Sequence, residues 1–136
     1  MSKSLNILIM DPPYESSNTA SAFRIIEASI RKGINVTVFA YEGATALAFK
    51  HQKGHPNPVK KTSVEEEKHP LTKDFVSSLF ELAKGKGVEL TWINCGLCVD
   101  ERGVMDAVEG PVRGGPPQFV QALNNCDQTL VIATTR

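Results

Sequence analysis

The chain has 136 residues, with 15 lysines and arginines balanced by 15 aspartates and glutamates. A formal net charge of zero gives no electrostatic case for binding nucleic acid or an anionic membrane, and no apolar run approaches the roughly 20 residues that span a bilayer. The length fits one domain over residues 1–136, large enough to fold without a metal or a disulfide.

The first half of the chain alternates predicted strands and helices. Apolar runs with β-branched residues indicate strands, and apolar residues at helical spacing indicate helices. The expected elements are a strand over 5–10, a helix from Asn18 or Thr19 to about Lys32, a strand over 35–41 and a short helix over 44–49.

Residues 50–70 differ from the rest of the chain. Four lysines in 50–61 are followed by three glutamates in 62–70, and no apolar periodicity is present. Segments of this length without periodicity are usually lids, docking elements or disordered loops. We expect a flexible charged insert here, and its composition favours a solvated loop over a docking element.

The second half continues the alternation. The expected elements are a helix from Thr72 to about 85–87, a strand over 89–94, a helix over 98–108, a Gly- and Pro-rich connection over 109–117, a helix over 117–125 and a strand over 129–135. Alternating strands and helices predict a three-layer α/β/α fold, flavodoxin-like in style, with a mostly parallel sheet of four to five strands. Ligands in such sheets gather where strands end, so we expect a functional rim at 11–18, 42–43, 95–98 and 134–136.

The cysteine pair in Cys95-Gly-Leu-Cys98 lies on this rim, between a predicted strand and a predicted helix. A thiol at the amino end of a helix is expected to have a lowered pKa and to be a better nucleophile. Asp100 and Glu101 oppose this effect, and Arg102 or Arg113 could offset their charge. The alternative for both cysteines is a structural one, because free cysteine is often buried.

Metal and nucleotide sites are less well supported. One Cys-x-x-Cys motif supplies two ligands where a structural zinc site needs four; Cys126 precedes the last strand and so lies at the opposite edge, and the histidines lie in the insert. The loop at 14–20 has neither a glycine fingerprint nor a Walker signature, which argues against a nucleotide or flavin. We therefore expect no cofactor. The odd count of three cysteines and an N-terminus unlike a signal peptide predict a cytoplasmic location.

The sequence resembles the DsrE/DsrF-like family of small sulfur-handling proteins, which includes TusD-type sulfurtransferase subunits. The resemblance is carried by Lys32-Gly33, Glu42-Gly43, Cys95-Gly-Leu-Cys98 with Arg102-Gly103-Val104, Glu109-Gly110, Arg113-Gly114 and the segment 126–132. It implies a DsrE-like fold, a persulfide carried on Cys98, and a homo-oligomer of trimer or hexamer type. It also implies a donor or acceptor partner such as a TusA- or rhodanese-like sulfur carrier.

Three functions stay open at this point. In the first, Cys98 accepts sulfane sulfur and passes it to a partner thiol, as a sulfurtransferase or carrier would. In the second, Cys95 and Cys98 form a redox dithiol, for which the Cys-x-x-Cys spacing is suitable. In the third, the protein is a non-catalytic subunit that binds a small ligand or another protein.

Overall fold

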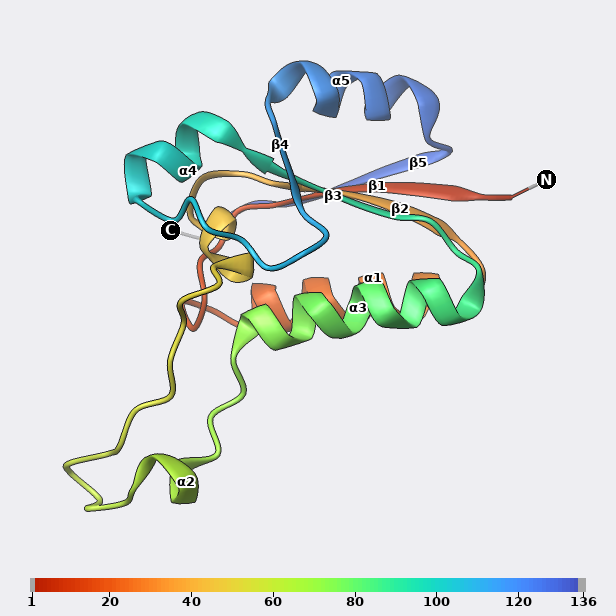
Figure 1. Cartoon of the computed structure of the whole chain (residues 1–136). Coiled ribbons are helices and arrows are strands. Elements are labelled where there is room, and N and C mark those ends of the chain that lie inside the picture. Colours follow the sequence, from red (N-terminus) through yellow and green to blue (C-terminus); the bar gives the residue numbers. More distant parts are fainter. Residues whose placement is uncertain (1, 135–136) are drawn as a thin grey trace.

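A computed structural model describes residues 2–134, which form a five-stranded parallel sheet flanked by helices (Figure 1). The strand order is β4-β3-β2-β1-β5, and every neighbouring pair is parallel. The strands are β1 (Ser4–Ile9), β2 (Asn35–Ala40), β3 (Leu90–Cys95), β4 (Val112–Gly114) and β5 (Gln128–Ile132). The predicted α/β class with a parallel sheet of four to five strands is confirmed.

The helices divide between the two faces of this sheet. The helices α1 (Asn18–Arg31) and α3 (Thr72–Lys86) lie side by side on one face, whereas α5 (Pro116–Asn125) covers the other (Figure 1). The short helix α4 (Gly96–Arg102) follows β3 directly, and the 3-10 helix η1 (Glu42–Ala48) follows β2. This arrangement puts α4 and η1 at the edge of the sheet where β2 and β3 end.

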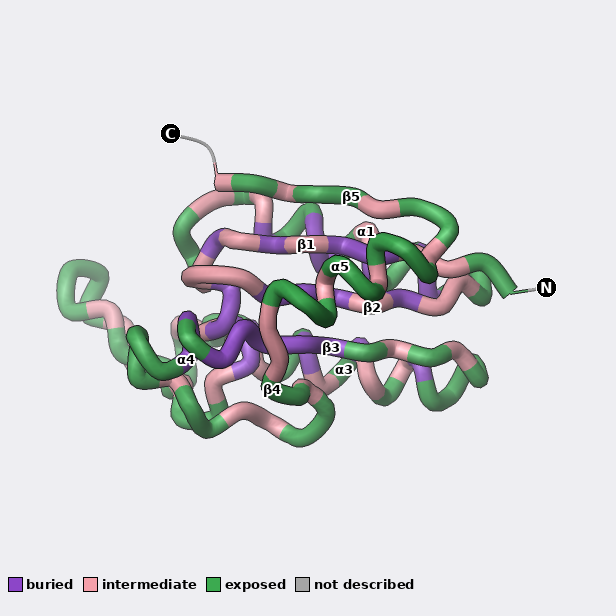
Figure 2. Tube along the Cα trace, turned by 90° about the horizontal axis from the view of Figure 1, so that it is seen from above, coloured by how far each residue is buried: buried purple, intermediate pink, exposed green. Residues whose placement is uncertain are grey.

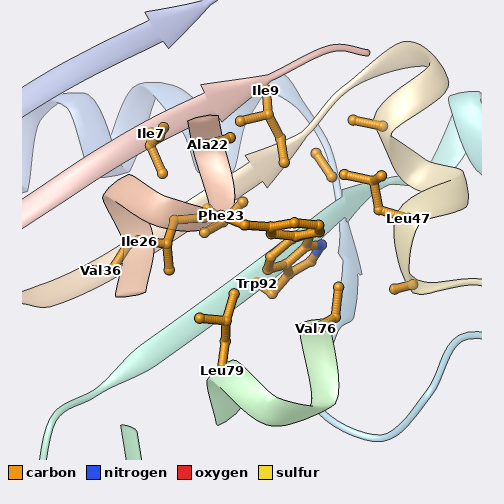
Figure 3. Packing of buried hydrophobic residues seen from close by; sticks show 14 of the residues in the cluster. Ile7, Ile9, Ala22, Phe23, Ile26, Val36, Leu47, Val76, Leu79 and Trp92 are labelled. Atoms are coloured by element: carbon orange, nitrogen blue, oxygen red, sulfur yellow. The ribbon is translucent and has the colours of Figure 1, made fainter. Parts of the chain in front are cut away.

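The face under α1 and α3 contains the main core. Trp92 of β3 is fully buried there, against Phe23 of α1, with Leu79 and Val76 of α3 close by (Figure 3). The indole nitrogen donates a hydrogen bond to the Asn94 side chain at 3.1 Å, so the buried N–H has a partner. The buried members of the cluster are Ile7, Ile9, Ala22, Phe23, Ile26, Ile30, Val36, Val38, Ala40, Ala44, Leu47, Ala48, Val76, Leu79, Ala83 and Trp92.

The opposite face is packed more thinly. Its buried cluster consists of Phe39, Ile93, Cys95 and Cys98, with Phe119 of α5 packed against it. The helix α5 has no buried residue of its own. Both edge strands and α5 are mostly exposed or intermediate when the molecule is viewed from above (Figure 2).

Two elements outside the 50–70 insert differ from the sequence prediction. The segment expected to be a connection contains β4, whose three residues are flanked by proline and glycine and give no strand periodicity. The helix expected over 98–108 begins at Gly96 and ends at Arg102, because Gly103 adopts a left-handed conformation with φ 66°. The other predicted elements are present with bounds shifted by a few residues.

Residues 50–70 form an arm that extends from the body (Figure 1). The arm contains α2 (Val64–Glu67), which Ser63 and Glu66 close with a capping box, and a turn joined by an isolated bridge between Asn57 and Thr62. The Thr62 hydroxyl donates to Glu67 and lowers the pKa of that carboxyl. The short helix was not expected from the sequence; flexibility of the insert stays a prediction.

Candidate functional site

Both cysteines of the Cys-x-x-Cys motif lie at the carboxyl end of β3, on the thinly packed face. Cys95 is the last residue of the strand, and Cys98 lies in the first turn of α4. Their exposed fractions are only 3% and 7%, and they pack with Phe39 and Ile93. No disulfide joins them, and both are free thiols. The strand-to-helix corner therefore brings both cysteines into one cluster with little exposed surface.

The Cys98 sulfur receives a hydrogen bond from a different loop. The backbone N–H of Glu42, just after β2, donates to Cys98 Sγ at 3.2 Å. Glu42 adopts a left-handed backbone conformation with φ 49°, which is uncommon for a residue with a Cβ atom. The turn after β2 is thus held in an unfavourable conformation at the point where its amide meets the sulfur.

The environment raises the pKa of the Cys98 thiol above its ordinary value. Burial is the largest cause, followed by the hydrogen bond with Cys95; the Glu42 N–H and the charge of Arg102 act in the opposite direction. The sequence predicted a lowered pKa from the helix amino end. That prediction is wrong because the desolvation of the sulfur outweighs the Glu42 N–H and the Arg102 charge, which favour the thiolate.

The acidic residues beside Cys98 are each paired with an arginine. Arg113 holds Asp100 through two hydrogen bonds, of 2.8 and 2.6 Å, and lowers the pKa of that carboxyl. Arg102 lies 3.8 Å from Glu101. The two arginines that the sequence analysis considered as a charge offset therefore both lie where they can act, and the negative charge near Cys98 is partly neutralised.

Arg113 also covers the backbone between the two cysteines. It comes from β4, where it pairs in register with Asn94 of β3. A Cβ atom added at Gly96 would lie 2.6 Å from Arg113 Nε, so glycine lets the guanidinium approach the chain closely. Sequence reasoning could not place Arg113, because β4 was not predicted.

The predicted rim loop after β1 makes no described hydrogen bond to Cys98. Asp11 is buried after β1 and accepts hydrogen bonds from the Ser16 hydroxyl and from Asn18 Nδ2, so these groups form an internal turn. The C-terminal part of the rim, at 135–136, lies outside the described residues. The Glu42–Gly43 turn is the only predicted rim loop with a described hydrogen bond to the sulfur of Cys98, and the role of its backbone amide had no signal in the sequence.

The histidines and Cys126 lie away from this site. His51 pairs with Asp106 at 2.9 Å, His55 lies beside His69 in the arm with ring centroids 4.7 Å apart, and Cys126 follows α5. Within residues 2–134, no three or more His, Cys, Asp or Glu side chains are grouped so that they could hold a metal ion. None of the helices described there is long and apolar enough to cross a membrane.

Comparison with known proteins gives a family and several solved structures, among them the two described below. The model of the DsrE/DsrF-like family matches residues 3–132. The ychN protein from E. coli is similar in structure, with a TM-score of 0.71, 18% sequence identity, and coverage of 97% of this chain and 100% of that chain. A conserved protein of unknown function from Bacteroides thetaiotaomicron matches with a TM-score of 0.53, 15% identity, and coverage of 96% and 95%. No curated protein matches the sequence.

Proposed function

Because the chain belongs to the DsrE/DsrF-like family, we propose that it is a cytoplasmic sulfur carrier or sulfurtransferase that holds sulfane sulfur as a persulfide on Cys98. At the level of the family, the fold is one associated with sulfur relay; the TusD-type subgroup stays a prediction. The single observation that best supports the proposal is the hydrogen bond from the Glu42 amide to Cys98 Sγ, at the position where the sequence resembles the family's sulfur-bearing cysteine.

The proposed transfer has two balanced steps. The Cys98 thiolate attacks the outer sulfur of a donor persulfide, so that a sulfur–sulfur bond to Cys98 forms while the donor's sulfur–sulfur bond breaks and the donor leaves as a thiolate. A thiolate of the acceptor then attacks the outer sulfur on Cys98, and Cys98 leaves as a thiolate. No external oxidant or reductant is consumed, and no organic cofactor is needed.

The raised pKa of Cys98 has a consequence for this cycle. A buried, protonated thiol reacts slowly with oxidants and alkylating agents, because the thiolate is the reactive form. The unloaded protein would therefore be protected, and sulfur transfer would require a partner that docks at α4 and η1 and opens access to the sulfur. A TusA- or rhodanese-like carrier is the partner class we propose.

An exposed apolar surface supports the proposed homo-oligomer, a trimer or hexamer. The surface is formed by exposed residues of β4, α5 and β5 on the thinly packed side, namely Val112, Val120, Leu123 and Val131. Leu123→Glu places a charge on this surface, in the last turn of α5, and should lower the mass measured by light scattering. If that variant has the same oligomeric state as the wild type, the interface does not include this surface.

The test of the carrier function is the intact mass of the protein after exposure to a sulfane-sulfur donor. The wild type should gain one sulfur atom, and a reductant should remove it. Cys98→Ser should gain none, whereas the matched control Cys126→Ser should load like the wild type, since Cys126 lies beyond α5. A serine variant at position 98 that still loads would show that Cys98 is not the carrier.

The contact between the cysteines favours a dithiol redox function as the second candidate. Cys95 and Cys98 lie in one buried cluster, Cys95 contributes to the raised pKa of Cys98, and their Cys-x-x-Cys spacing is compatible with a disulfide. In this case, mild oxidation should remove two hydrogens reversibly from the wild type and from Cys126→Ser. Sulfur loading that persists in Cys95→Ser would favour the carrier over the dithiol.

A further inference from the structure

A cavity of about 660 Å³ lies between α1 and α3, on the outer side of the two helices. Its floor is apolar and includes Phe23, Phe75, Leu79 and Leu82. The rings of Phe23 and Phe75 are stacked, with centroids 5.5 Å apart, although Phe75 is 45% exposed. A half-exposed phenylalanine stacked in a groove of this size is typical of a small-molecule site more than of a closed core.

The rim of the cavity carries a net positive charge. Arg24, Glu27 and Arg31 follow one another along the same side of α1 and all line the cavity. Glu27 is already paired with Arg31 at 3.2 Å, whereas Arg24 makes no ion pair or side-chain hydrogen bond with any residue in 2–134. An unpaired guanidinium beside an apolar floor is suited to one anionic group on an otherwise apolar ligand.

The charge distribution also orients such a ligand. At the other end of the groove, Tyr14 lies close enough to Asp74 for that carboxylate to raise the pKa of the phenol, after the larger effect of burial. The Tyr14 hydroxyl is already bonded to the Pro70 carbonyl. The Asp74 carboxylate would repel an anion at the Tyr14 end, so we expect the anionic group at the Arg24–Arg31 side.

We propose that the groove between α1 and α3 binds a small amphiphile with an aliphatic or aromatic body and a single anionic group. The body lies on Phe23, Phe75 and Leu79, and the anionic group lies at Arg24. From Thr19 to Arg31 the groove follows α1 for about 18 Å, which accommodates a medium-length alkyl chain. This site does not include Cys95 or Cys98, and the proposal is independent of the sulfur-carrier function.

The first test is calorimetric titration with decanoate, below its micelle concentration, and with decanol as the uncharged counterpart. The wild type should bind one decanoate per chain. Ser78→Phe should abolish the binding of both probes, because Ser78 is exposed in the lining and a phenyl ring there fills the groove. Binding of decanoate that Ser78→Phe leaves unchanged would overturn the proposal.

The second test separates the charge from the apolar contact. Arg24→Ala should weaken decanoate binding by about fivefold, as expected for a partly exposed ion pair, and should leave decanol binding unchanged. Lys84→Ala, on the part of α3 outside the lining, is the matched control and should bind both probes like the wild type. If Arg24→Ala and Lys84→Ala weaken decanoate binding equally, the loss reflects only the net charge of the protein, and the assigned position of the anion is overturned.

A third measurement locates the probe. The chain has a single tryptophan, Trp92, whose ring lies 6.4 Å from that of Phe23 on the cavity floor. Decanoate with a bromine on its terminal carbon should quench Trp92 fluorescence in the wild type and in Cys98→Ser, and not in Ser78→Phe. Quenching that survives in Ser78→Phe would place the ligand elsewhere, and loss of quenching in Cys98→Ser would connect the groove to the thiol site.

Discussion

The two faces of the sheet differ in how they are built. The face under α1 and α3 buries a large apolar cluster around Trp92, and the two long helices pack over it. The face under α5 has a buried cluster of four residues, two of which are Cys95 and Cys98, and it leaves apolar side chains exposed. One sheet thus separates the residues that stabilise the fold from those proposed to do chemistry.

This separation has a physical consequence. A reactive thiol must be approached by a partner, and a face held by fewer contacts opens at a lower free energy. The same thin packing leaves apolar surface that other chains can cover. If stability and thiol chemistry divide between the two faces, substitutions on each face should have separable effects.

The largest effect is expected on the well-packed face. Trp92→Ala should lower the free energy of unfolding by about 3–5 kcal/mol, because it leaves a large cavity and removes the partner of Asn94. Thr91→Ala is the matched control, since it changes the neighbouring exposed residue of the same strand, and it should stay within about 0.5 kcal/mol. Denaturant unfolding measures both, and similar losses would contradict the division between the faces.

The next effect concerns the titration of Cys98. Since its folded-state pKa is raised, the protonated thiol is favoured by the fold. The associated stability is complete below the unfolded thiol pKa of about 8.5 and is lost as the pH rises through the higher folded value. Unfolding measured across this range should show the wild type losing stability relative to Cys98→Ser as the pH rises.

The rate of Cys98 alkylation can be measured from the mass of the peptide that contains it. In the native protein this rate should keep rising above the pH at which the rate in the denatured protein levels off. Cys95 is one cause of the raised pKa of Cys98, so Cys95→Ser should move the alkylation midpoint of Cys98 down toward its ordinary value. If the pH midpoint of Cys98 alkylation were lower in the native than in the denatured protein, the pKa of Cys98 would be lowered, as the sequence predicted.

A smaller effect is expected where α5 meets the cysteine cluster. Phe119 is partly buried and lies with its ring centroid 5.6 Å from that of Phe39. Phe119→Ala should lower the free energy of unfolding by about 1–2 kcal/mol, less than truncation of a fully buried aromatic residue. It should also speed the alkylation of Cys98, because it opens the cluster that covers the sulfur. Phe75→Ala, at a stacked but half-exposed ring on the other face, should leave the alkylation rate unchanged.

The sequence predicted the position of the thiols better than their environment. Strand and helix periodicity placed Cys95 and Cys98 at the carboxyl edge of a parallel sheet, because that placement depends on local pattern and on a general topological rule. The direction of the pKa shift depends on how deeply Phe39 and Ile93 cover the sulfur, which is a tertiary property. The strand β4 was missed because three residues are too few to show a period, and the position of Arg113 was missed with it.

The smallest effect tests the turn that meets the sulfur. Glu42 has a left-handed backbone that glycine adopts without penalty, so Glu42→Gly should raise the free energy of unfolding by up to about 1 kcal/mol. Glu42→Ala removes the same carboxylate but keeps the Cβ atom, and it should give no gain. If the strain serves to aim the amide at Cys98, the stabilised glycine variant should load sulfur more slowly, since a relaxed turn holds its N–H less firmly at 3.2 Å. Equal loading in the glycine and alanine variants would show that the strain has no part in the thiol chemistry, and the thin face would then contribute access to the sulfur rather than its alignment.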